Sequence, residues 1–215
     1  MAVSRLMQTV RESKSKKHKK TQYPEEFEMK CKIVEDLKTG GALFLNSSKA
    51  YIACICHISS RKIKECPTQS ALVEATKNFA KELPEDLDLT IQLKRVTKAQ
   101  ENIIEASKEL ETQLNLSVFT PLDDWIKTEY HLFQSNQKTL RKRRLELDAE
   151  AARKKTPSEE MKDSFTYKAH AEQYESVMIL LRKIPDHITK FTRIINSWQS
   201  IHREYYSKCA KAMNN

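Results

Sequence analysis

The chain has 215 residues, a formal net charge of +9 at pH 7 and only two glycines. Charged residues make up 31% and apolar residues 39%, which is less apolar than a compact globular domain, and glycine for turns is scarce. The composition therefore predicts an all-α protein with long, narrow helices. No run of consecutive apolar residues approaches the length of a membrane-spanning helix, and the N-terminus lacks the apolar core of a secretory signal. We expect a cytoplasmic protein that is peripheral on membranes.

The first twenty residues hold most of the positive charge and predict a basic amphipathic arm, residues 1–22. Seven cations and one acid give this stretch +6 of the total +9. Four apolar residues recur at i, i+3, i+4 and i+7, which lines up one face of a helix. Such a helix is suited to lie in a membrane interface among anionic headgroups. The predicted inserting residues are Val3, Leu6, Met7 and Val10, and the predicted electrostatic contacts are Arg5, Arg11, Lys14, Lys16, Lys17, Lys19 and Lys20.

Two other interpretations of the arm remain open. The lysine run from Lys14 to Lys20 also fits a nuclear localisation signal or a nucleic-acid-binding tail, because lysine clusters attract any polyanion. It also fits a tail that only solubilises the chain. The apolar stripe favours the membrane, since binding to phosphates needs no such face. We therefore expect no nucleic-acid partner.

Residues 23–215 are predicted to form one domain of three coiled-coil helices. Tyr23-Pro24 begins the first helix and the run 82–86 ends it; the second spans about 87–154, and the third begins with an acidic first turn at Glu159-Glu160. Apolar residues alternate in steps of three and four along each helix, as in a heptad repeat. The predicted core includes Phe27, Val34, Leu37, Phe44, Tyr51, Ile55, Ile58, Leu93, Val96, Ile103, Leu110, Leu114, Val118, Leu122, Tyr174, Val177, Leu181, Ile184, Ile188, Phe191, Ile195 and Trp198.

Three prolines lie inside these predicted helices. They are Pro67, Pro121 and Pro185, one in each helix. A proline kinks a helix at a fixed place, so the bundle is expected to be bent.

Further cations gather in three places outside the arm. Taken alone, a basic run on a helix is most often a solvated face. Their position near the far end of the second helix and in the loop of the first nevertheless suggests contact with a membrane. These predicted electrostatic residues are Lys138, Arg141, Lys142, Arg143, Arg144, Arg153, Lys154, Lys155, Arg61, Lys62 and Lys64.

The sequence offers no pattern of a catalytic or metal site. Cys54 and Cys56 are two positions apart and point to different sides of a helix, and no second Cys/His pair lies near His57. The other histidines have no recurring Asp or Ser partner, and no glycine-rich phosphate loop exists. We expect no enzyme activity, cofactor, metal ion or small-molecule substrate.

The order of motifs resembles the N-BAR domain of the endophilins. The most specific pieces are Phe119-Thr120-Pro121-Leu122 and Arg143-Arg144-Leu145-Glu146-Leu147-Asp148, which follow a basic arm, the stretch 70–83 and an acidic loop. The resemblance implies an elongated, kinked three-helix coiled coil that pairs as an antiparallel homodimer. It also implies a six-helix crescent whose cationic concave face binds and curves anionic phospholipid membranes.

Some features depart from the endophilins. Glu150, Ala151 and Ala152 occupy most of the places that are basic in that family, so only Arg153, Lys154 and Lys155 remain at the tip. The appendage within the first helix is shortened to about residues 59–67. The chain ends at Asn215 without a Src-homology-3 domain, so recruitment of proline-rich partners through such a domain is not expected.

The sequence thus predicts a homodimer that senses or generates membrane curvature, in endocytosis or vesicle trafficking. The arm would insert as a wedge, and the dimer would act as the scaffold. The alternative is a coiled-coil adaptor or assembly protein whose basic arm targets the nucleus or an acidic partner.

Overall fold

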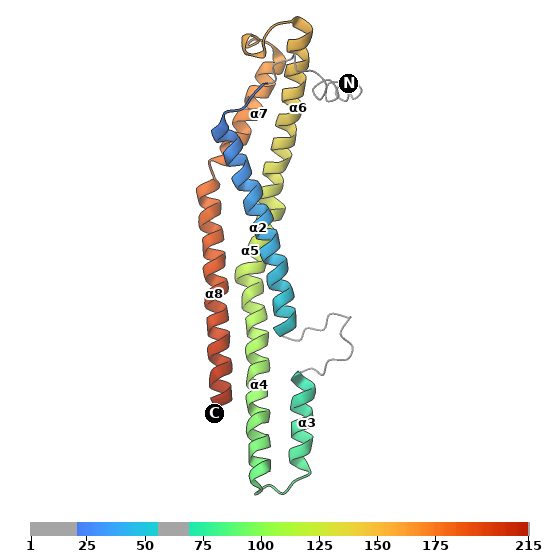
Figure 1. Ribbon diagram of the computed structural model, residues 1–215, viewed down its shortest axis with the longest axis vertical. Helices are drawn as coiled ribbons and strands as arrows, with labels where there is room; N and C mark the ends of the chain where they lie inside the picture. The colour runs from blue at the N-terminus through green and yellow to red at the C-terminus, as the bar shows by residue number, and fades with distance from the viewer. Residues whose placement is uncertain (1–20, 56–68, 215) are drawn as a thin grey trace. The chain divides into compact units, whose positions relative to one another are not determined.

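The computed structural model describes residues 21–55 and 69–214, apart from the side chain of Glu159, and nearly all of them are helical (Figure 1). The described residues contain no strand, so the all-α prediction is confirmed. Short π-helical turns, η1 (Asn115–Phe119) and η2 (Ile126–Tyr130), flank α5, and a 3-10 turn, η3 (Ser158–Glu160), follows α6. The α-helices are α2 (Glu25–Ile55), α3 (Gln69–Lys81), α4 (Asp88–Leu114), α5 (Thr120–Trp125), α6 (His131–Lys154), α7 (Phe165–Leu181) and α8 (Ile184–Asn214).

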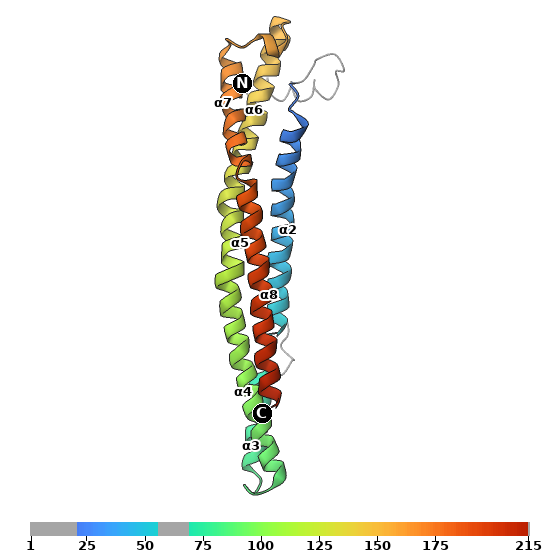
Figure 2. The same ribbon diagram turned by 90° about the vertical axis from the view of Figure 1, so that its left-hand side faces the viewer.

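The described chain forms two compact units. Unit 1 contains the residues up to Thr39 together with Trp125–Ile188, and unit 2 contains Gly40–Asp124 and Thr189–Asn215. In unit 1, α6 and α7 run side by side (Figure 2). In unit 2, α3 and α4 pair in the same way. The site described below lies in unit 1.

The core of unit 1 lies among α2, α6 and α7. Phe133, Leu140 and Leu147 recur every seven residues along α6 and are all buried. Val177 and Leu181 are the buried residues of α7 toward its C-terminal end. Burial of such side chains contributes about 1.5–3 kcal/mol each, so this seam holds the two helices together.

A glycine of α2 allows close packing in the core of unit 2. A Cβ atom at Gly41 would lie 2.9 Å from the Phe191 ring and 3.2 Å from Leu122, so α2 approaches its neighbours closely at this position. Leu114 and Val118 are fully buried in the same unit. Between α3 and α4, the Thr97 hydroxyl donates a 2.9 Å hydrogen bond to the Thr76 hydroxyl oxygen.

The buried seam of α2 differs in part from the predicted one. Tyr51 was expected in the core, but its side chain is 42% exposed and its hydroxyl lies 2.6 Å from that of Tyr206. Leu37 and Phe44 are only half-buried. The buried residues of α2 are spaced alternately four and three positions apart when the half-buried Lys38 is counted with them. They are Phe27, Cys31, Val34, Gly41, Leu45, Ser48 and Ile52.

Two prolines coincide with irregular helix geometry. Pro121 has no N–H to donate, and π-helical turns precede and follow its short helix α5; the Thr120 N–H bonds to the Asn115 carbonyl, five residues back. Pro185 follows the break between α7 and α8. Both prolines thus lie where regular α-helix is interrupted, and the expected bend of the bundle stays a prediction. Pro67 and Ile58 lie outside the described residues.

The third predicted helix begins later than expected. Glu159 and Glu160 belong to the 3-10 turn η3 and not to a first α-helical turn, so that prediction is wrong. Helix α7 starts at Phe165, where the Ser164 hydroxyl oxygen accepts a 3.2 Å hydrogen bond from the Tyr167 N–H. The serine at the N-cap thus satisfies one of the backbone donors of the first turn of α7.

Two predicted core positions of the third helix and one of the second are exposed. Ile188 is 47% exposed and Ile195 is 44% exposed, while the neighbouring His187 and Ile194 are buried. Val96 of α4 is 45% exposed, and Thr97 beside it is buried. At all three places the buried residue lies one position before or after the predicted one; His187 and Thr97 are polar, and Ile194 is as apolar as Ile195.

Candidate functional site

Many predicted site residues lie outside the described residues. This holds for the whole basic arm and for the cations expected in the loop of the first predicted helix. They are Val3, Leu6, Met7, Val10, Arg5, Arg11, Lys14, Lys16, Lys17, Lys19, Lys20, Arg61, Lys62 and Lys64. The site can therefore be built only from the cations of α6 and of the segment that follows it.

Three of the predicted cations form a stripe on the outward side of α6. Lys138, Arg141 and Lys142 are exposed and are spaced i, i+3 and i+4, so they share one helix face. The buried Leu140 is two positions from Lys138, about 200° around the helix. Among the described residues none of the three cations forms an ion pair, although Arg141 donates to the Gln137 side-chain oxygen at 3.2 Å. Their charges remain available to an external anion.

The next two arginines of α6 have carboxylate neighbours. An N–H of Arg143 donates a 3.1 Å hydrogen bond to the Glu146 carboxylate. Arg144 Nε lies 4.0 Å from the buried Asp148 Oδ2, which is an ion pair without a hydrogen bond. The structure thus separates the predicted cluster into three available cations and two compensated ones.

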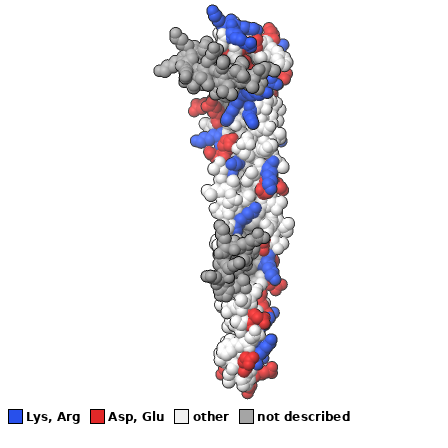
Figure 3. Space-filling view, turned by 90° about the vertical axis from the view of Figure 1, so that its right-hand side faces the viewer, with Lys and Arg blue, Asp and Glu red and all other residues white. Residues whose placement is uncertain are grey.

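The end of α6 contributes a second group of cations. Arg153, Lys154 and Lys155 are all exposed. Lys154 pairs with Glu150 at 2.7 Å, and the hydrogen bonds that Glu150 accepts, first from Lys154 and then from Thr166, lower its pKa. Lys155 has a left-handed backbone with φ of 54°, and its N–H bonds to the Ala151 carbonyl. Figure 3 shows Lys and Arg side chains gathered in the part of the molecule that Figure 1 assigns to α6 and α7.

The segment between α6 and α7, residues 155–164, is a structured connection. Met161 of this segment is buried, and η3 lies at the centre of the segment. Two exposed lysines that the sequence analysis did not single out lie here and in the first turn of α7: Lys162 and Lys168. In the sequence, the acidic neighbours Glu160 and Asp163 hide the positive charge of this region. The charge becomes apparent only when the connection is seen to follow α6 directly.

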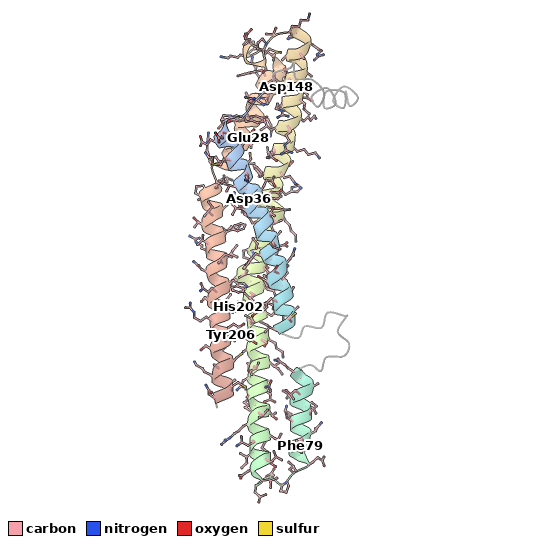
Figure 4. All side chains as sticks on the ribbon, in the orientation of Figure 1. Glu28, Asp36, Phe79, Asp148, His202 and Tyr206 are labelled. Atoms are coloured by element: carbon pink, nitrogen blue, oxygen red, sulfur yellow. The ribbon has the colours of Figure 1, made fainter. Side chains whose placement is uncertain are left out.

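A buried aspartate ties the beginning of the described chain to this connection. The Thr21 backbone N–H and the Thr21 hydroxyl donate to the same oxygen, Asp148 Oδ1, at 3.2 and 2.6 Å. The hydroxyl oxygens of Thr21 and Ser158 lie 3.3 Å apart. Asp148 is on α6, near its end (Figure 4). Local sequence patterns do not predict this contact, because it joins residues 127 positions apart.

The neighbouring Tyr23 attaches the same segment to α7. Its ring stacks on His170 and on Tyr174, with centroids 5.9 and 5.8 Å away, and packs on Phe27 at 4.8 Å. Its hydroxyl lies 3.2 Å from His170 Nε2. Burial raises the pKa of Tyr23 to about 12 and lowers that of His170. Both side chains are therefore neutral at pH 7.

The comparisons with known proteins give one match. The BAR domain family model matches residues 1–215, the whole length of the chain. No curated protein matches the sequence. In the part of the chain that the structure describes, no helix combines the length and the apolar character needed to cross a membrane.

The family match agrees with the architecture. The described residues form packed helices with heptad-like seams, and cations lie on the outward side of α6. BAR domains are structural modules and not enzymes, and they act at the membrane surface. The chain therefore belongs to the BAR domain family, whose members are helical modules that bind membranes and sense or generate their curvature.

Proposed function

We propose that this chain is a homodimeric protein that binds anionic membranes through its cations and inserts its N-terminal arm as an amphipathic wedge. The observation that carries the proposal is the outward stripe of Lys138, Arg141 and Lys142, which have no ion pair among the described residues. A polar helix face of a purely structural protein would mix both signs of charge. This stripe instead offers three cations to an external anionic surface.

The binding free energy that each cation contributes favours a membrane over a single small ligand as the partner. Each cation near an anionic leaflet contributes about 1 kcal/mol. The three stripe residues, Arg153 and Lys155 together therefore give a binding energy of a few kcal/mol, which is useful only when many contacts form at once. A seven-cation arm adds contacts of the same kind, and a dimer doubles them through effective concentration.

Exposed apolar residues support the homodimer. On the α8 portion of unit 2, Ile195, Tyr206 and Met213 are 44, 52 and 64% exposed. Their spacing of eleven and seven residues places them on one stripe of the helix. A second copy of the chain is the partner that we propose for this stripe, because family members pair through their helices. The proposed setting, by resemblance to the endophilins, is endocytosis or vesicle trafficking.

The arm is tested by cosedimentation with phosphatidylserine vesicles. Leu6→Ser combined with Met7→Ser removes apolar area from the proposed inserting face but leaves every charge in place. We expect the variant to retain weak, salt-sensitive binding and to lose tubulation, because the wedge is gone and the cations remain. A matched control, Gln8→Ser, changes a polar residue of the same stretch and should behave as the unmodified chain.

Two outcomes would contradict the proposal. If the intact chain stays in the supernatant at low ionic strength, the membrane function is wrong and an adaptor role becomes the better explanation. If the Leu6/Met7 variant tubulates vesicles as well as the intact chain does, the membrane function stands but the wedge does not.

A further inference from the structure

Two threonines of the chain precede a proline, and their backbones differ. They are Thr120, followed by Pro121, and Thr156, followed by Pro157; no serine precedes a proline in the sequence. One class of protein kinases selects a proline directly after the hydroxyl that it phosphorylates, in a pocket that has no backbone N–H to satisfy. Both threonines carry this minimal motif, so the backbone around each of them decides which one such an enzyme can use.

Thr120 lies inside helical backbone. Its φ is −62° and its ψ is −51°, and its N–H bonds to the Asn115 carbonyl. Pro121 belongs to the short helix α5 that begins at Thr120. A protein kinase binds the residues around its substrate hydroxyl as an extended strand, so this hydroxyl reaches the active site only after local unfolding of the helix. Thr120 is exposed, but its backbone has the wrong shape.

Thr156 lies in the non-helical α6–α7 connection of unit 1, which Figure 1 shows as the turn that joins α6 to α7. It follows the left-handed Lys155, and Pro157 has φ of −55° and ψ of 142°, an extended, polyproline-like conformation. The Thr156 side chain is half-buried, but the 3.2 Å hydrogen bond that its hydroxyl donates to the Lys154 carbonyl is exposed. This hydroxyl is therefore presented without unfolding of a helix.

A phosphate on Thr156 would lie among the cations at the end of α6. Arg153, Lys154 and Lys155 precede it directly and are all exposed. A phosphothreonine carries a charge of about −1.5 to −2 near pH 7, so the formal charge of residues 153–156 would change from +3 to about +1 to +1.5. At least half of the positive charge that this stretch offers to an anionic surface would be cancelled.

We propose that Thr156 is the phosphorylation site of a proline-directed protein kinase, and that its phosphate weakens the binding of the α6 end to anionic membranes. The Thr156 Oγ1 attacks the γ-phosphorus of ATP, and the new O–P bond forms as the bond from that phosphorus to the β–γ bridging oxygen breaks. ADP leaves with the electron pair, and the hydroxyl proton passes to the catalytic aspartate of the kinase. The effect on binding rests on the proposed function, whereas the assignment of the phosphorylated residue does not.

The first experiment identifies the phosphorylated residue in the folded, full-length chain. The chain is incubated with a mitogen-activated protein kinase, magnesium and ATP, and mass spectrometry locates the phosphate. We expect at least about tenfold more phosphate on Thr156 than on the more exposed Thr120, because only Thr120 requires local unfolding. Thr156→Ala should lose this product, and Pro157→Ala should lose most of it although the hydroxyl remains. Thr120→Ala is the matched control and should keep it.

The second experiment measures what the phosphate does to binding. At low ionic strength the phosphorylated chain should bind phosphatidylserine vesicles at least about fivefold more weakly than the untreated chain. The difference should shrink as added salt screens the charges, and a phosphatase should restore the binding. Thr156→Ala incubated with the kinase and ATP is the control, and it should bind as it does without the kinase.

The outcomes separate the site from the function. Phosphate found mainly on Thr120, or on neither threonine, would overturn the assignment of Thr156. If Thr156 is phosphorylated but the product binds vesicles as tightly as the untreated chain, the site stands and its effect on binding is wrong. If the untreated chain ignores vesicles, the proposed function fails and the effect on binding fails with it, while mass spectrometry still decides the site.

Discussion

Lys155 combines an exposed positive charge with a left-handed backbone conformation. It is the only non-glycine residue with positive φ in the described parts of the chain, and it ends α6 at the position where glycine is usual. A residue with a Cβ atom in this conformation is about 1 kcal/mol less stable than glycine. The lysine keeps a cation at the end of α6 despite that cost.

Replacing this lysine should therefore separate stability from binding. Lys155→Gly should raise the free energy of unfolding by about 1 kcal/mol and weaken vesicle binding by up to about fivefold. Urea unfolding and cosedimentation measure the two effects. Lys155→Ala is the control, because it loses the charge but keeps the Cβ atom; it should bind as weakly as the glycine variant without gaining its stability. A glycine variant that is less stable than the intact chain would contradict this account.

His170 gives unit 1 a pH dependence whose sign follows from its burial. Burial lowers its pKa below the ordinary 6.5, with the nearby Asp148 raising it in part and Arg144 lowering it further. The folded state thus favours the neutral imidazole. The stability that this preference contributes is present above pH 6.5 and is lost as the pH falls through the lowered pKa of the folded state.

We therefore expect the free energy of unfolding to fall between pH 7 and pH 5 more steeply in the intact chain than in His170→Gln. Urea unfolding at several pH values measures this difference. The neutral variant cannot take up a proton, so its curve lacks the contribution of this group. Parallel curves would show that His170 is not held neutral by burial.

At the scale of the helix, α2 shows why small residues matter. Its buried seam includes Cys31, Gly41 and Ser48 as well as large apolar residues. The Gly41 Cα lies against Phe191 and Leu122, whereas a Cβ atom on the adjacent Gly40 would meet nothing within 4 Å. Two neighbouring glycines in one helix thus have opposite environments.

This pair yields a matched prediction. Gly40→Ala should stabilise the protein by about 0.5–1 kcal/mol, because alanine favours the helix and has room. Gly41→Ala should destabilise it by about 1–3 kcal/mol, because its Cβ atom would lie 2.9 Å from the Phe191 ring. Thermal unfolding of the two variants measures the contrast. Equal effects would mean that α2 does not approach Phe191 as described.

The same elements show how far the sequence alone leads. The all-α class, the irregularities at Pro121 and Pro185, and much of the seam around Leu110, Leu114 and Val118 were predictable, because they depend on local spacing. The seam of α2 was only partly predictable, since apolar patterning does not register a buried glycine or serine. The contact of Thr21 with Asp148 could not be found, because local patterns contain no information about partners 127 residues apart.

At the scale of the whole molecule, we propose different partners for the apolar stripe of α8 and for the positive charge. Ile195, Tyr206 and Met213 are exposed in the single chain, and Tyr206 bonds through its hydroxyl to Tyr51, an interaction that raises its pKa to about 12. The net charge of +9 favours an anionic surface. The proposed partner of the stripe is a second copy of the chain, and the proposed partner of the cations is the membrane.

Substitutions in the stripe should weaken the proposed dimer. Ile195→Gln combined with Met213→Gln should raise the dimer dissociation constant at least about tenfold, since apolar area would no longer be buried. Sedimentation equilibrium measures the constant. Ser200→Gln, an exposed position on another side of α8, is the control and should leave it unchanged. A dimer that tolerates the double substitution must use another surface.

The central claim is that exposed cations bring this BAR domain to anionic lipid, and one measurement tests it most directly. The fraction of intact protein that sediments with phosphatidylserine vesicles is followed as the ionic strength rises from about 0.05 to about 0.5 M. Salt screens exposed charges, so we predict nearly complete binding at the low end and a steep loss toward the high end. Binding that does not change with salt, or no binding at the low end, would contradict the account.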